Sequence, residues 1–430
     1  MVVVALDDTD SRQDGGCTTY RAARIADRLD ERGVSVDRRL LVRLNPAVPH
    51  KTRGNAAVAV HVDRSAADLD LDAMFTIAQE ELGAARTDDP DTHPGLVVAD
   101  HDPVDAPDTV VTFARRAIRE LLDLDEARSL IDAHGYRYRG WGVGRGLIGA
   151  VAAVGAWAAF DEWTYERLSY RESERRGTQR SVDEDSIFDA ADAAYPAVWD
   201  TVDREEGETV CVPNAPGPVL HGIRGDDPAA VERVADAIES EPVERATTFV
   251  TNQGTDAHLR NATIDAVRDG RAYCVGGTVV EPPETRIGGH VFVTIADEDL
   301  PDPTTLDCVA FEPTRRFRDR VRALRVGDRI TACGEIGRGT IKLEKFAVRH
   351  LRRTERVVPE CPDCGRSMES AGVDQGYRCR ACRTAATDKV EIRIERDLEV
   401  GWYEVPPCAR RHIAKPLIRG GFDAPIHPER

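Results

Sequence analysis

The chain has 430 residues, of which 41% are hydrophobic and 31% charged, and its 76 acidic and 58 basic residues give a formal net charge of −18. At about 150 residues per domain, this length predicts about three domains with separate cores. The acidic balance excludes a protein that coats nucleic acid through a generally basic surface. Only five of the basic residues are lysines, and alanine and aspartate are abundant, which suggests adaptation to a salt-rich cytoplasm.

Apolar stretches and cysteines indicate the compartment. The longest apolar stretch, 146–160, is rich in alanine and glycine. It is shorter than the roughly 20 residues that a bilayer crossing needs. The N-terminal apolar run has no basic flank before it, unlike a secretory signal. Ten cysteines are too few for a disulfide scaffold in a chain of this length. We therefore expect a cytoplasmic protein without a membrane partner.

The first part of the chain, residues 1–195, has an α/β pattern. Strand-like segments such as 2–6 and 56–62 alternate with helix-like segments such as 18–32 and 108–122. Such alternation predicts a sheet covered by helices.

A smaller unit is predicted after residue 195. From Glu208 the pattern gives a strand, a turn at 214–218, a strand at 219–225, a helix near 228–238 and a strand at 246–252. This succession of strands and one helix is typical of a small ferredoxin-like α+β unit.

Short strands dominate from about residue 272 to residue 348. A helix-like segment, 317–324, lies between the third and the fourth of five predicted strands. That order predicts an OB-fold, a β-barrel that commonly holds single-stranded nucleic acid or exposed RNA loops. The overlapping segment 311–356 has a net charge of +8 in an acidic chain. Such a segment indicates either a solvated helix face or a phosphate-binding surface.

Two CxxC turns follow the predicted barrel. Cys361 and Cys364 form the first turn, and Cys379 and Cys382 form the second. Each such turn presents two thiolates, so two turns complete the tetrahedral site of a structural zinc ion. Buried cysteines without metal and a redox pair are the alternatives.

Acidic residues follow the first predicted strand. Asp7, Asp8 and Asp10 lie at its end, before a turn that leads into a helix starting at Thr18 and Thr19. Carboxylates in this position can hold Mg²⁺, and a helix N-terminus can hold phosphate. The alternative is a capping turn of the kind found at many strand ends, with the threonines as helix caps.

A glycine-rich run precedes the apolar helix of the first region. Gly142, Gly144 and Gly146 surround Arg145, and glycines let backbone amides approach phosphate oxygens while arginine neutralises them. The run matches neither the Walker A motif nor a complete dinucleotide fingerprint. Close packing of the helix is the alternative.

Two further polar segments are candidate substrate contacts. Residues 251–258, with Asp256, form either a substrate loop or a turn. In the segment 314–318 an aromatic residue alternates with arginines, as RNA stacking and phosphate contact require. An exposed amphipathic helix is the alternative for this second segment.

Taken together, these motifs resemble one known family. The segments LDDTD, CTTY, GRGLIGA, TNQGTDAH, FEPTRRFR, the two CxxC turns and EVPPCARRH occur in this order between residue 5 and about residue 416. This combination resembles archaeal tRNA 2-agmatinylcytidine synthetases, here of a salt-loving archaeon. These enzymes modify the wobble cytidine of the isoleucine tRNA with the anticodon CAU.

The resemblance implies a multidomain α+β protein with four parts. They are a kinase-like α/β catalytic domain (1–195), a ferredoxin-like domain (196–265), an OB-fold that binds RNA (266–351), and a zinc ribbon with a C-terminal tail (352–430). It further implies that ATP activates carbon 2 of the cytosine, that agmatine attacks this carbon, and that AMP and pyrophosphate are released. The implied cofactors are ATP, Mg²⁺ and Zn²⁺, the partners are agmatine and this tRNA, and no DNA is expected.

The resemblance and the motifs together give a set of site residues. Thr18 is the expected phosphorylation site, with Thr19 as the alternative if the match shifts by one residue. The expected catalytic residues are Thr18, Asp7, Asp8 and Asp10, the ATP-binding residues are Gly142, Gly144, Arg145 and Gly146, the substrate residues are Asp256, Arg315, Arg316, Phe317 and Arg318, and the zinc ligands are Cys361, Cys364, Cys379 and Cys382.

Two points remain open at this level. A non-catalytic single-strand-binding protein with an OB-fold and a zinc ribbon is the main alternative, although it leaves residues 1–260 without a role. Salt weakens phosphate contacts, so stacking must supply more of the affinity in a salty cell. We therefore expect Phe317→Ala to weaken tRNA binding at high salt more than Arg322→Ala does.

Overall fold

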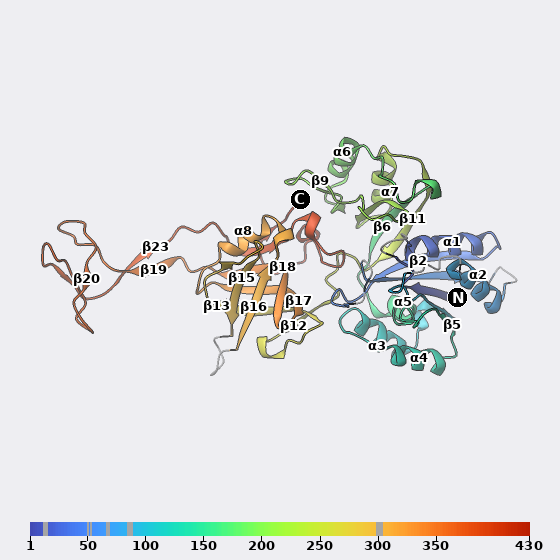
Figure 1. The fold of residues 1–430 in the computed structure, drawn as a ribbon, viewed down its shortest axis with the longest axis horizontal. Helices are drawn as coiled ribbons and strands as arrows, with labels where there is room; N and C mark the ends of the chain where they lie inside the picture. Colours follow the sequence, from blue (N-terminus) through green and yellow to red (C-terminus); the bar gives the residue numbers. More distant parts are fainter. Residues whose placement is uncertain (12–15, 50, 52–53, 66–68, 84–88, 298–303) are drawn as a thin grey trace.

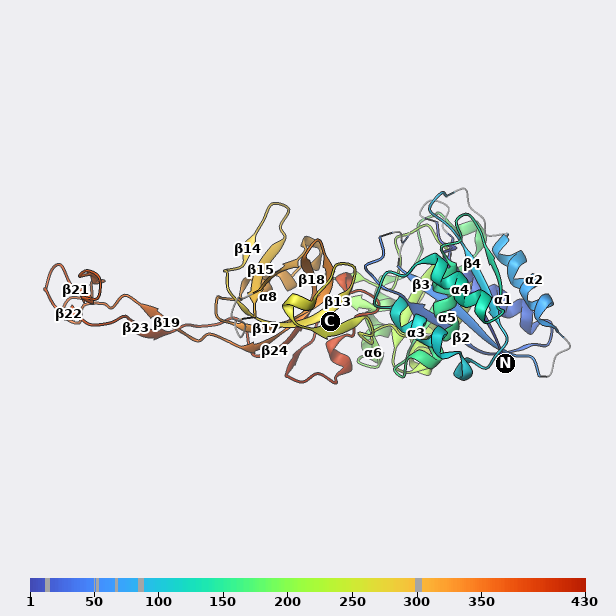
Figure 2. The ribbon, with the colours of Figure 1, turned by 90° about the horizontal axis from the view of Figure 1, so that it is seen from below.

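The computed structural model describes residues 1–430 except 12–15, 50, 52–53, 66–68, 84–88 and 298–303. Three parts follow one another along its longest axis (Figure 1): an N-terminal body with helices on both faces of a sheet, a β-barrel, and a thin ribbon that extends away from the barrel. The view rotated by 90° in Figure 2 shows the same three parts along the same axis. Within the described ranges, no helix is long and apolar enough to span a membrane.

The N-terminal body is built on a nine-stranded sheet with the order β5-β4-β1-β3-β2-β11-β6-β10-β7. Its strands are β1 (Val2–Asp7), β2 (Ser35–Arg43), β3 (Ala56–Asp63), β4 (Gly95–Ala99), β5 (Arg137–Gly140), β6 (Thr164–Arg171), β7 (Val198–Trp199), β10 (Val219–Gly225) and β11 (Val243–Thr251).

Two halves of this sheet meet where β11 runs parallel to β2. The side chain of Asn252 continues the junction past the last strand pair. Its amide oxygen accepts a hydrogen bond from the backbone N–H of Arg43 at 2.7 Å, and its amide nitrogen donates to the Arg43 carbonyl at 3.0 Å. The two halves therefore share one continuous network of hydrogen bonds.

Helices cover both faces of the first half. Alternate residues of a strand point to opposite faces, so Val2 and Val4 pack in one core and Val3 and Ala5 in another. The first core includes α1 (Thr18–Asp30) and α2 (Leu71–Gly83), and the second includes α3 (Asp108–Ala117), α4 (Leu124–Ala133) and α5 (Leu147–Ala159). The predicted sheet covered by helices is confirmed, but its strands β5, β4, β1, β3 and β2 pair antiparallel, so this part is α+β and not an α/β fold with a parallel sheet.

The second half follows the element order β6, α6 (Glu184–Ala194), β7, β10, α7 (Pro228–Ala237) and β11. β6 lies between β11 and β10 and pairs with both. The predicted limit at residue 195 falls inside this group, because β6 and α6 precede it while their partners in the sheet and the core follow it.

The middle part is a closed five-stranded barrel. Its strands are β13 (Ala272–Val279), β15 (Val291–Ala296), β16 (Thr305–Ala310), β17 (Arg329–Gly337) and β18 (Thr340–His350). The barrel closes because β13 pairs with β15 and β17, and β18 pairs with β16 and β17. α8 (Phe317–Arg322) lies between the third and the fourth of these strands, as predicted.

Phe317, the first residue of α8, lies in the core of this barrel. Its side chain is 0% exposed, and its ring centroid lies 5.6 Å from that of Phe346. The prediction that Phe317 stacks on RNA bases is therefore wrong, because a ring without an accessible face cannot contact a base. The alternative interpretation, an amphipathic helix whose apolar side faces inward, describes this segment. For the same reason, there is no longer a basis for expecting Phe317→Ala to weaken tRNA binding at high salt more than Arg322→Ala does.

The C-terminal part leaves the barrel and returns to it. β19 (Thr354–Val357) pairs with β23 (Val390–Arg393) and carries the ribbon strands β20 (Glu369–Ser370), β21 (Tyr377–Arg378) and β22 (Ala385–Ala386) at its end. The chain then pairs β24 (Gly401–Glu404) with β18 and β25 (Ile426–His427) with β24. The remaining short elements are β8 (Val202–Asp203), β9 (Glu208–Thr209), β12 (Leu259–Ala262), β14 (Glu284–Thr285), and the 3-10 turns Pro103–Asp105, Ser173–Arg175, Ile264–Ala266, Glu312–Thr314, Pro407–Ala409 and Leu417–Arg419.

Candidate functional site

Two adjoining cavities lie where β1 ends and α1 begins. The first has a volume of about 240 Å³, and Asp7 and Asp8 lie in its wall, so we name it the carboxylate cavity. The second has a volume of about 220 Å³, and Arg43 and Arg224 lie in its wall, so we name it the arginine cavity. Both cavities share the residues Asp10, Thr18, Gly54 and Ala56 in their walls. A reaction that joins two bound molecules could take place across this shared wall.

The carboxylate cavity concentrates acidic groups in a buried setting. Burial and the neighbouring carboxylate of Asp8 raise the pKa of Asp7 well above its ordinary value. Burial also raises the pKa of Asp8, although Arg145 opposes this shift from 3.2 Å. Buried carboxylates with raised pKa values are suited to binding a cation, because a divalent ion displaces their protons.

Thr18 and Asp10 form a hydrogen-bonded pair at the shared wall. The Thr18 hydroxyl donates to Asp10 Oδ1 at 3.1 Å, and the Thr18 backbone N–H donates to the same oxygen at 2.7 Å. The hydroxyl of Thr9 donates to Thr18 Oγ1 at 3.0 Å. A hydroxyl that donates to a carboxylate has a base within reach for its proton, which is the geometry of an activated nucleophile.

The glycine run serves mainly to bring α5 close to the strand ends. A side chain at Gly149 would place its Cβ 1.9 Å from Asp7 Oδ2, and one at Gly146 would meet the Asp7 carbonyl oxygen at 2.6 Å. Gly142 and Gly144, with φ of 59° and 77°, form the turn before this helix and do not line either cavity. Of the four predicted ATP-binding residues, Arg145 and Gly146 thus lie at the carboxylate cavity.

The arginine cavity has mixed charge and apolar walls. Glu166 on β6 lies 3.7 Å from Arg43 Nη2 and 3.9 Å from Arg224 Nε, measured from its carboxylate oxygens. Gln253 donates to the same carboxylate at 2.5 Å. Leu168, Pro213, Ala215, Pro218 and Val219 supply apolar surface in the wall.

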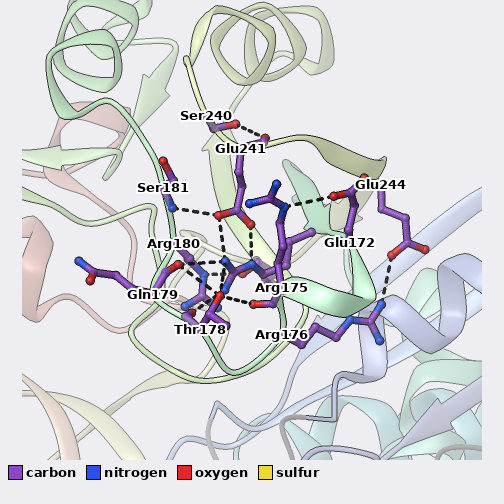
Figure 3. A network of polar contacts seen from close by, with 12 residues as sticks. Glu172, Arg175, Arg176, Thr178, Gln179, Arg180, Ser181, Ser240, Glu241 and Glu244 are labelled. Carbon is purple, nitrogen blue, oxygen red and sulfur yellow. Dashed lines mark hydrogen bonds and ion pairs between the residues drawn. The ribbon is translucent and has the colours of Figure 1, made fainter.

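A buried ion pair lies beside this cavity, within the network of polar contacts in Figure 3. Glu241 accepts two hydrogen bonds from Arg171, at 2.7 and 2.9 Å, and both side chains are buried. Glu241 also accepts from the Ser181 N–H at 2.9 Å, which fixes the loop before α6. Arg180 in this loop donates to the carbonyl oxygens of Ala215 and Val219 at 2.7 and 2.9 Å. The ion pair thus holds the loop whose arginine shapes the proline-rich wall.

Asp256 lies outside both cavities and has partners of its own. Its carboxylate accepts a hydrogen bond from Lys345 Nζ at 2.6 Å and one from the backbone N–H of Lys415 at 2.7 Å. These contacts join the first body to the barrel and to the C-terminal tail. The structure therefore does not bring Asp256 to the other predicted site residues, and its carboxylate acts here as a link between parts of the fold.

The predicted RNA-contacting arginines are engaged in polar contacts within the protein. Arg315 contacts Glu208 at 3.0 Å, and Arg316 contacts Asp203 at 3.0 Å and Glu429 at 2.5 Å. Arg318 donates to the Gly289 carbonyl at 2.8 Å. At this end of the barrel the exposed aromatic ring is Phe311, which lies edge-on to His290 with the ring centroids 5.1 Å apart.

The four ribbon cysteines form one cluster. Their sulfur atoms all lie within 4.8 Å of one another, as tetrahedral zinc requires, and the cluster comprises Cys361, Cys364, Cys379 and Cys382. Apart from these sulfurs, Met368, Tyr377 and Ala386 are the hydrophobic residues packed there. So small a core cannot stabilise a fold alone, and the donor set fits zinc.

We expect Cys379→Ser to release zinc and to unfold only the ribbon. The protein should contain one zinc per chain, and the variant should lose it while residues 358–398 become sensitive to protease. Cys408→Ser is the matched control, since Cys408 lies outside the cluster. Metal analysis and limited proteolysis measure both effects, and zinc retained by the Cys379 variant would contradict the assignment.

Sequence reasoning missed most residues of the arginine cavity. Arg43, Glu166, Arg224 and His412 come from β2, β6, β10 and the C-terminal tail, and no local motif connects them. The only available signal is weak: His412 ends the segment EVPPCARRH, which contributes to the family resemblance alone.

Comparisons with known proteins cover most of the chain. Residues 3–142, 144–258 and 358–398 match family models described as the TiaS TCKD domain, the TiaS FLD domain and the TiaS C-terminal zinc ribbon domain. A protein of Haloquadratum walsbyi, named TiaS and described as the 2-agmatinylcytidine synthetase of the second isoleucine tRNA, is 54% identical, with 100% of both chains covered. A relative of the same name from Methanosarcina acetivorans is 43% identical, again with 100% of both chains covered.

Solved structures are similar over the same extent. A crystal structure described as the complex of TiaS with the second isoleucine tRNA and ATP has a TM-score of 0.88 at 40% identity and covers 100% of this chain and 99% of that chain. Another, described as the complex of TiaS with this tRNA, AMPCPP and agmatine, has a TM-score of 0.86 at 37% identity, with the same coverage.

Proposed function

Because the chain belongs to the TiaS family of tRNA 2-agmatinylcytidine synthetases, we infer that it is a ligase that uses ATP to join agmatine to the wobble cytidine of the isoleucine tRNA with the anticodon CAU. The product is 2-agmatinylcytidine, and the reaction releases AMP and pyrophosphate. The Thr18–Asp10 pair, which lies in the wall shared by the two cavities, is the observation on which we base the location of the active site. One cavity takes the nucleotide and the other takes the amine.

ATP binds in the carboxylate cavity, in our proposal. Leu44, Val48, Pro49, Leu121 and Leu122 provide apolar surface for a purine ring. The phosphates then extend toward Arg145 and the start of α5, where the guanidinium group and the positive end of the helix dipole favour negative charge. Asp7, Asp8 and Asp10 fit Mg²⁺, since hard carboxylate oxygens favour a divalent ion and the pKa values of Asp7 and Asp8 are raised. Bound there, the ion supplies charge neutralisation for phosphoryl transfer.

Thr18 receives a phosphoryl group in this scheme, and Asp10 accepts the hydroxyl proton. The O–H bond of Thr18 breaks as its oxygen bonds to the terminal phosphorus of ATP, and the proton passes to Asp10 Oδ1 across the 3.1 Å hydrogen bond. The bond from that phosphorus to its bridging oxygen breaks at the same time, and the rest of the nucleotide leaves. Thr19 is less suited to this role, because its hydroxyl contacts the Cys17 sulfur at 3.0 Å. These contacts favour Thr18 over the neighbouring alternative.

Agmatine binds in the arginine cavity, in our proposal. Agmatine is a short apolar chain with a cation at each end, and this cavity combines apolar walls with the carboxylates of Asp10 and Glu166. Arg43 and Arg224 add a place for the phosphate that activates the cytosine oxygen. Mixed charge of this kind suits an amine next to a phosphorylated base.

The fold supports a finer division of the chain. We assign a kinase-like unit to β1–β5 with α1–α5, and a ferredoxin-like unit to β6, β7, β10 and β11 with α6 and α7. The second assignment is supported by the element order β-α-β-β-α-β and by the spatial order β11-β6-β10-β7. The barrel and the zinc ribbon then hold the tRNA, with the exposed ring of Phe311 as a stacking residue in place of the buried Phe317.

A transfer assay tests the function. Purified protein with ATP, Mg²⁺ and a transcript of the isoleucine tRNA with the anticodon CAU should attach labelled agmatine to the wobble cytidine and release AMP. Lysine in place of agmatine should not be attached. Binding of tRNA without transfer, in folded and zinc-loaded protein, would favour the alternative of a non-catalytic nucleic-acid-binding protein.

We expect Asp7→Asn to stabilise the ligand-free protein while abolishing transfer. Burial raises the pKa of Asp7 in the folded protein above its ordinary value of 3.8. The neutral carboxyl therefore stabilises the fold fully below pH 3.8, and this contribution is lost as the pH rises through the raised pKa. Asparagine removes this charge and still accepts the hydrogen bond from the Asp8 N–H. At pH 7 the Tm should rise by roughly 2–4 °C, the shift that ~1 kcal/mol gives in a domain of this size.

Thermal unfolding between pH 4 and pH 8 measures this effect. The difference between the two proteins should grow with pH and nearly disappear at the acidic end, where the Asp7 carboxyl is neutral in the folded protein. A Tm that falls on substitution at every pH would contradict the explanation. Asp72→Asn is a control, because Asp72 is exposed on α2, where it forms a surface ion pair with Arg137.

A further inference from the structure

One side chain of the arginine cavity comes from the far end of the chain. His412 lies beyond the zinc ribbon, in the tail that returns from β24, and it is an accessible residue in the wall of this cavity. Among the residues that the structure describes, none forms a hydrogen bond with its imidazole. An unpartnered imidazole in a cavity wall is available to a bound molecule.

The backbone around His412 is fixed on both sides. The His412 carbonyl accepts a hydrogen bond from the Gly254 N–H at 2.8 Å, and the Ile413 carbonyl accepts from the Asp256 N–H at 3.0 Å. Ile413 is buried in the core of the first body. Before it, Arg410 is buried in ion pairs with Asp200 and Glu404. The tail thus presents an imidazole from a rigid support, which is how catalytic side chains are held.

The charged neighbours of His412 keep it in the form that can accept a proton. The surrounding cavity wall, which disfavours the charged ring, and the guanidinium groups of Arg43 and Arg224 hold the pKa of His412 below its ordinary value. The ring is therefore neutral at physiological pH and offers a nitrogen lone pair. A phosphate bound between the two arginines would neutralise them and so make the imidazole more basic during the reaction. The titratable and charged groups in the wall of this cavity are Asp10, Cys17, Arg43, Glu166, Arg180, Cys211 and Arg224.

We propose that His412 is a catalytic residue that accepts the proton from the attacking amine of agmatine, an inference that rests on the proposed function. The primary amine first loses one proton to water, since only its neutral form is a nucleophile. Its nitrogen then bonds to carbon 2 of the cytosine, the bond from that carbon to the phosphorylated oxygen breaks, and this oxygen leaves on the phosphorus bound to it and ends in AMP or pyrophosphate. One proton moves from the nitrogen to the His412 imidazole and later to water.

His412→Gln tests this role, since glutamine keeps a polar side chain but cannot accept a proton. With saturating ATP and tRNA, transfer should fall about 100-fold in kcat, the usual contribution of a general base, while the KM for agmatine changes less than about twofold. Phosphorylation of Thr18 should proceed at the wild-type rate, because His412 does not line the carboxylate cavity.

The pH profile and rescue separate catalysis from a structural role. Relative to the wild type, the variant should regain activity as pH rises from 7 to 9.5, because hydroxide can then take the proton that the imidazole accepts, and added imidazole should partly restore His412→Ala. His134→Ala, at the C-terminal end of α4 and outside both cavities, serves as control. Full activity of His412→Gln, or an equal loss at every pH without rescue, would overturn the proposal. Absence of transfer by the wild-type protein would instead reject the proposed function.

Discussion

Thr18→Val is expected to lower agmatine transfer by at least about 1,000-fold, because valine has nearly the same shape as threonine but no oxygen to receive a phosphoryl group. The fold should survive, since the residue is buried and valine fills the same space. The lost hydroxyl leaves Asp10 with its hydrogen bond from the Thr18 backbone N–H at 2.7 Å. Single-turnover assays with labelled agmatine, together with mass spectrometry of the phosphorylated protein, measure the effect.

Thr19→Val is the matched control for this prediction. Thr19 is the next residue of α1, and its hydroxyl contacts the Cys17 sulfur and not a carboxylate. Transfer by this variant should stay within about threefold of the wild type. Transfer by Asp10→Asn should fall strongly, by about 100- to 10,000-fold, because the proton acceptor is lost. If Thr19→Val lost phosphorylation and Thr18→Val kept it, the assignment would move by one residue.

Phe317→Ala is expected to destabilise the barrel by about 3–5 kcal/mol, the usual effect of removing a buried aromatic ring and leaving a cavity. The ring contacts Phe346 in the core, and Phe346 in turn stacks on Tyr403 of the returning tail at 5.3 Å between centroids. Loss of Phe317 therefore weakens the packing of the tail as well as of the barrel. Urea unfolding followed by circular dichroism measures the change in free energy.

Phe311→Ala provides the comparison. Its ring is 36% exposed, so its removal should change the free energy of unfolding by less than about 1 kcal/mol. The same variant should weaken tRNA binding by about 1–3 kcal/mol if a base stacks there, and this loss should persist at high salt. An equal stability loss in both variants would contradict the burial seen in the structure.

The parts that the sequence predicted well are those whose signals are local. The CxxC turns require only that two short segments meet, and the barrel strands are marked by their length and by the helix after the third. Asp7, Asp8 and Thr18 line one cavity, as expected where a strand ends and a helix begins, while their catalytic roles stay a prediction. The ion pairs of Arg316 were not predictable, because Asp203 and Glu429 lie far from it in the chain.

Long-range features explain the remaining differences. β6 finds its partners β10 and β11 only after the loop and helix that follow it, so its place in the second half of the sheet could not be inferred. The arginine cavity is assembled from four separate regions, and the face of α8 that points inward depends on the barrel around it. A single sequence shows that a segment is amphipathic, but it does not show which core the apolar side chains of that segment enter.

The backbone junction between β2 and β11 has a mechanical consequence. Many two-lobed enzymes open like a clamshell around a hinge, and binding energy must then drive closure. Here a clamshell motion would break the backbone pairing of the two strands and the paired hydrogen bonds of Asn252 with Arg43. Arg43, at the end of β2, is therefore held in register with Glu166 before any substrate arrives. Such a scaffold loses little entropy when its reaction centre assembles. Substrates must then enter through movements of the loops and of the tail.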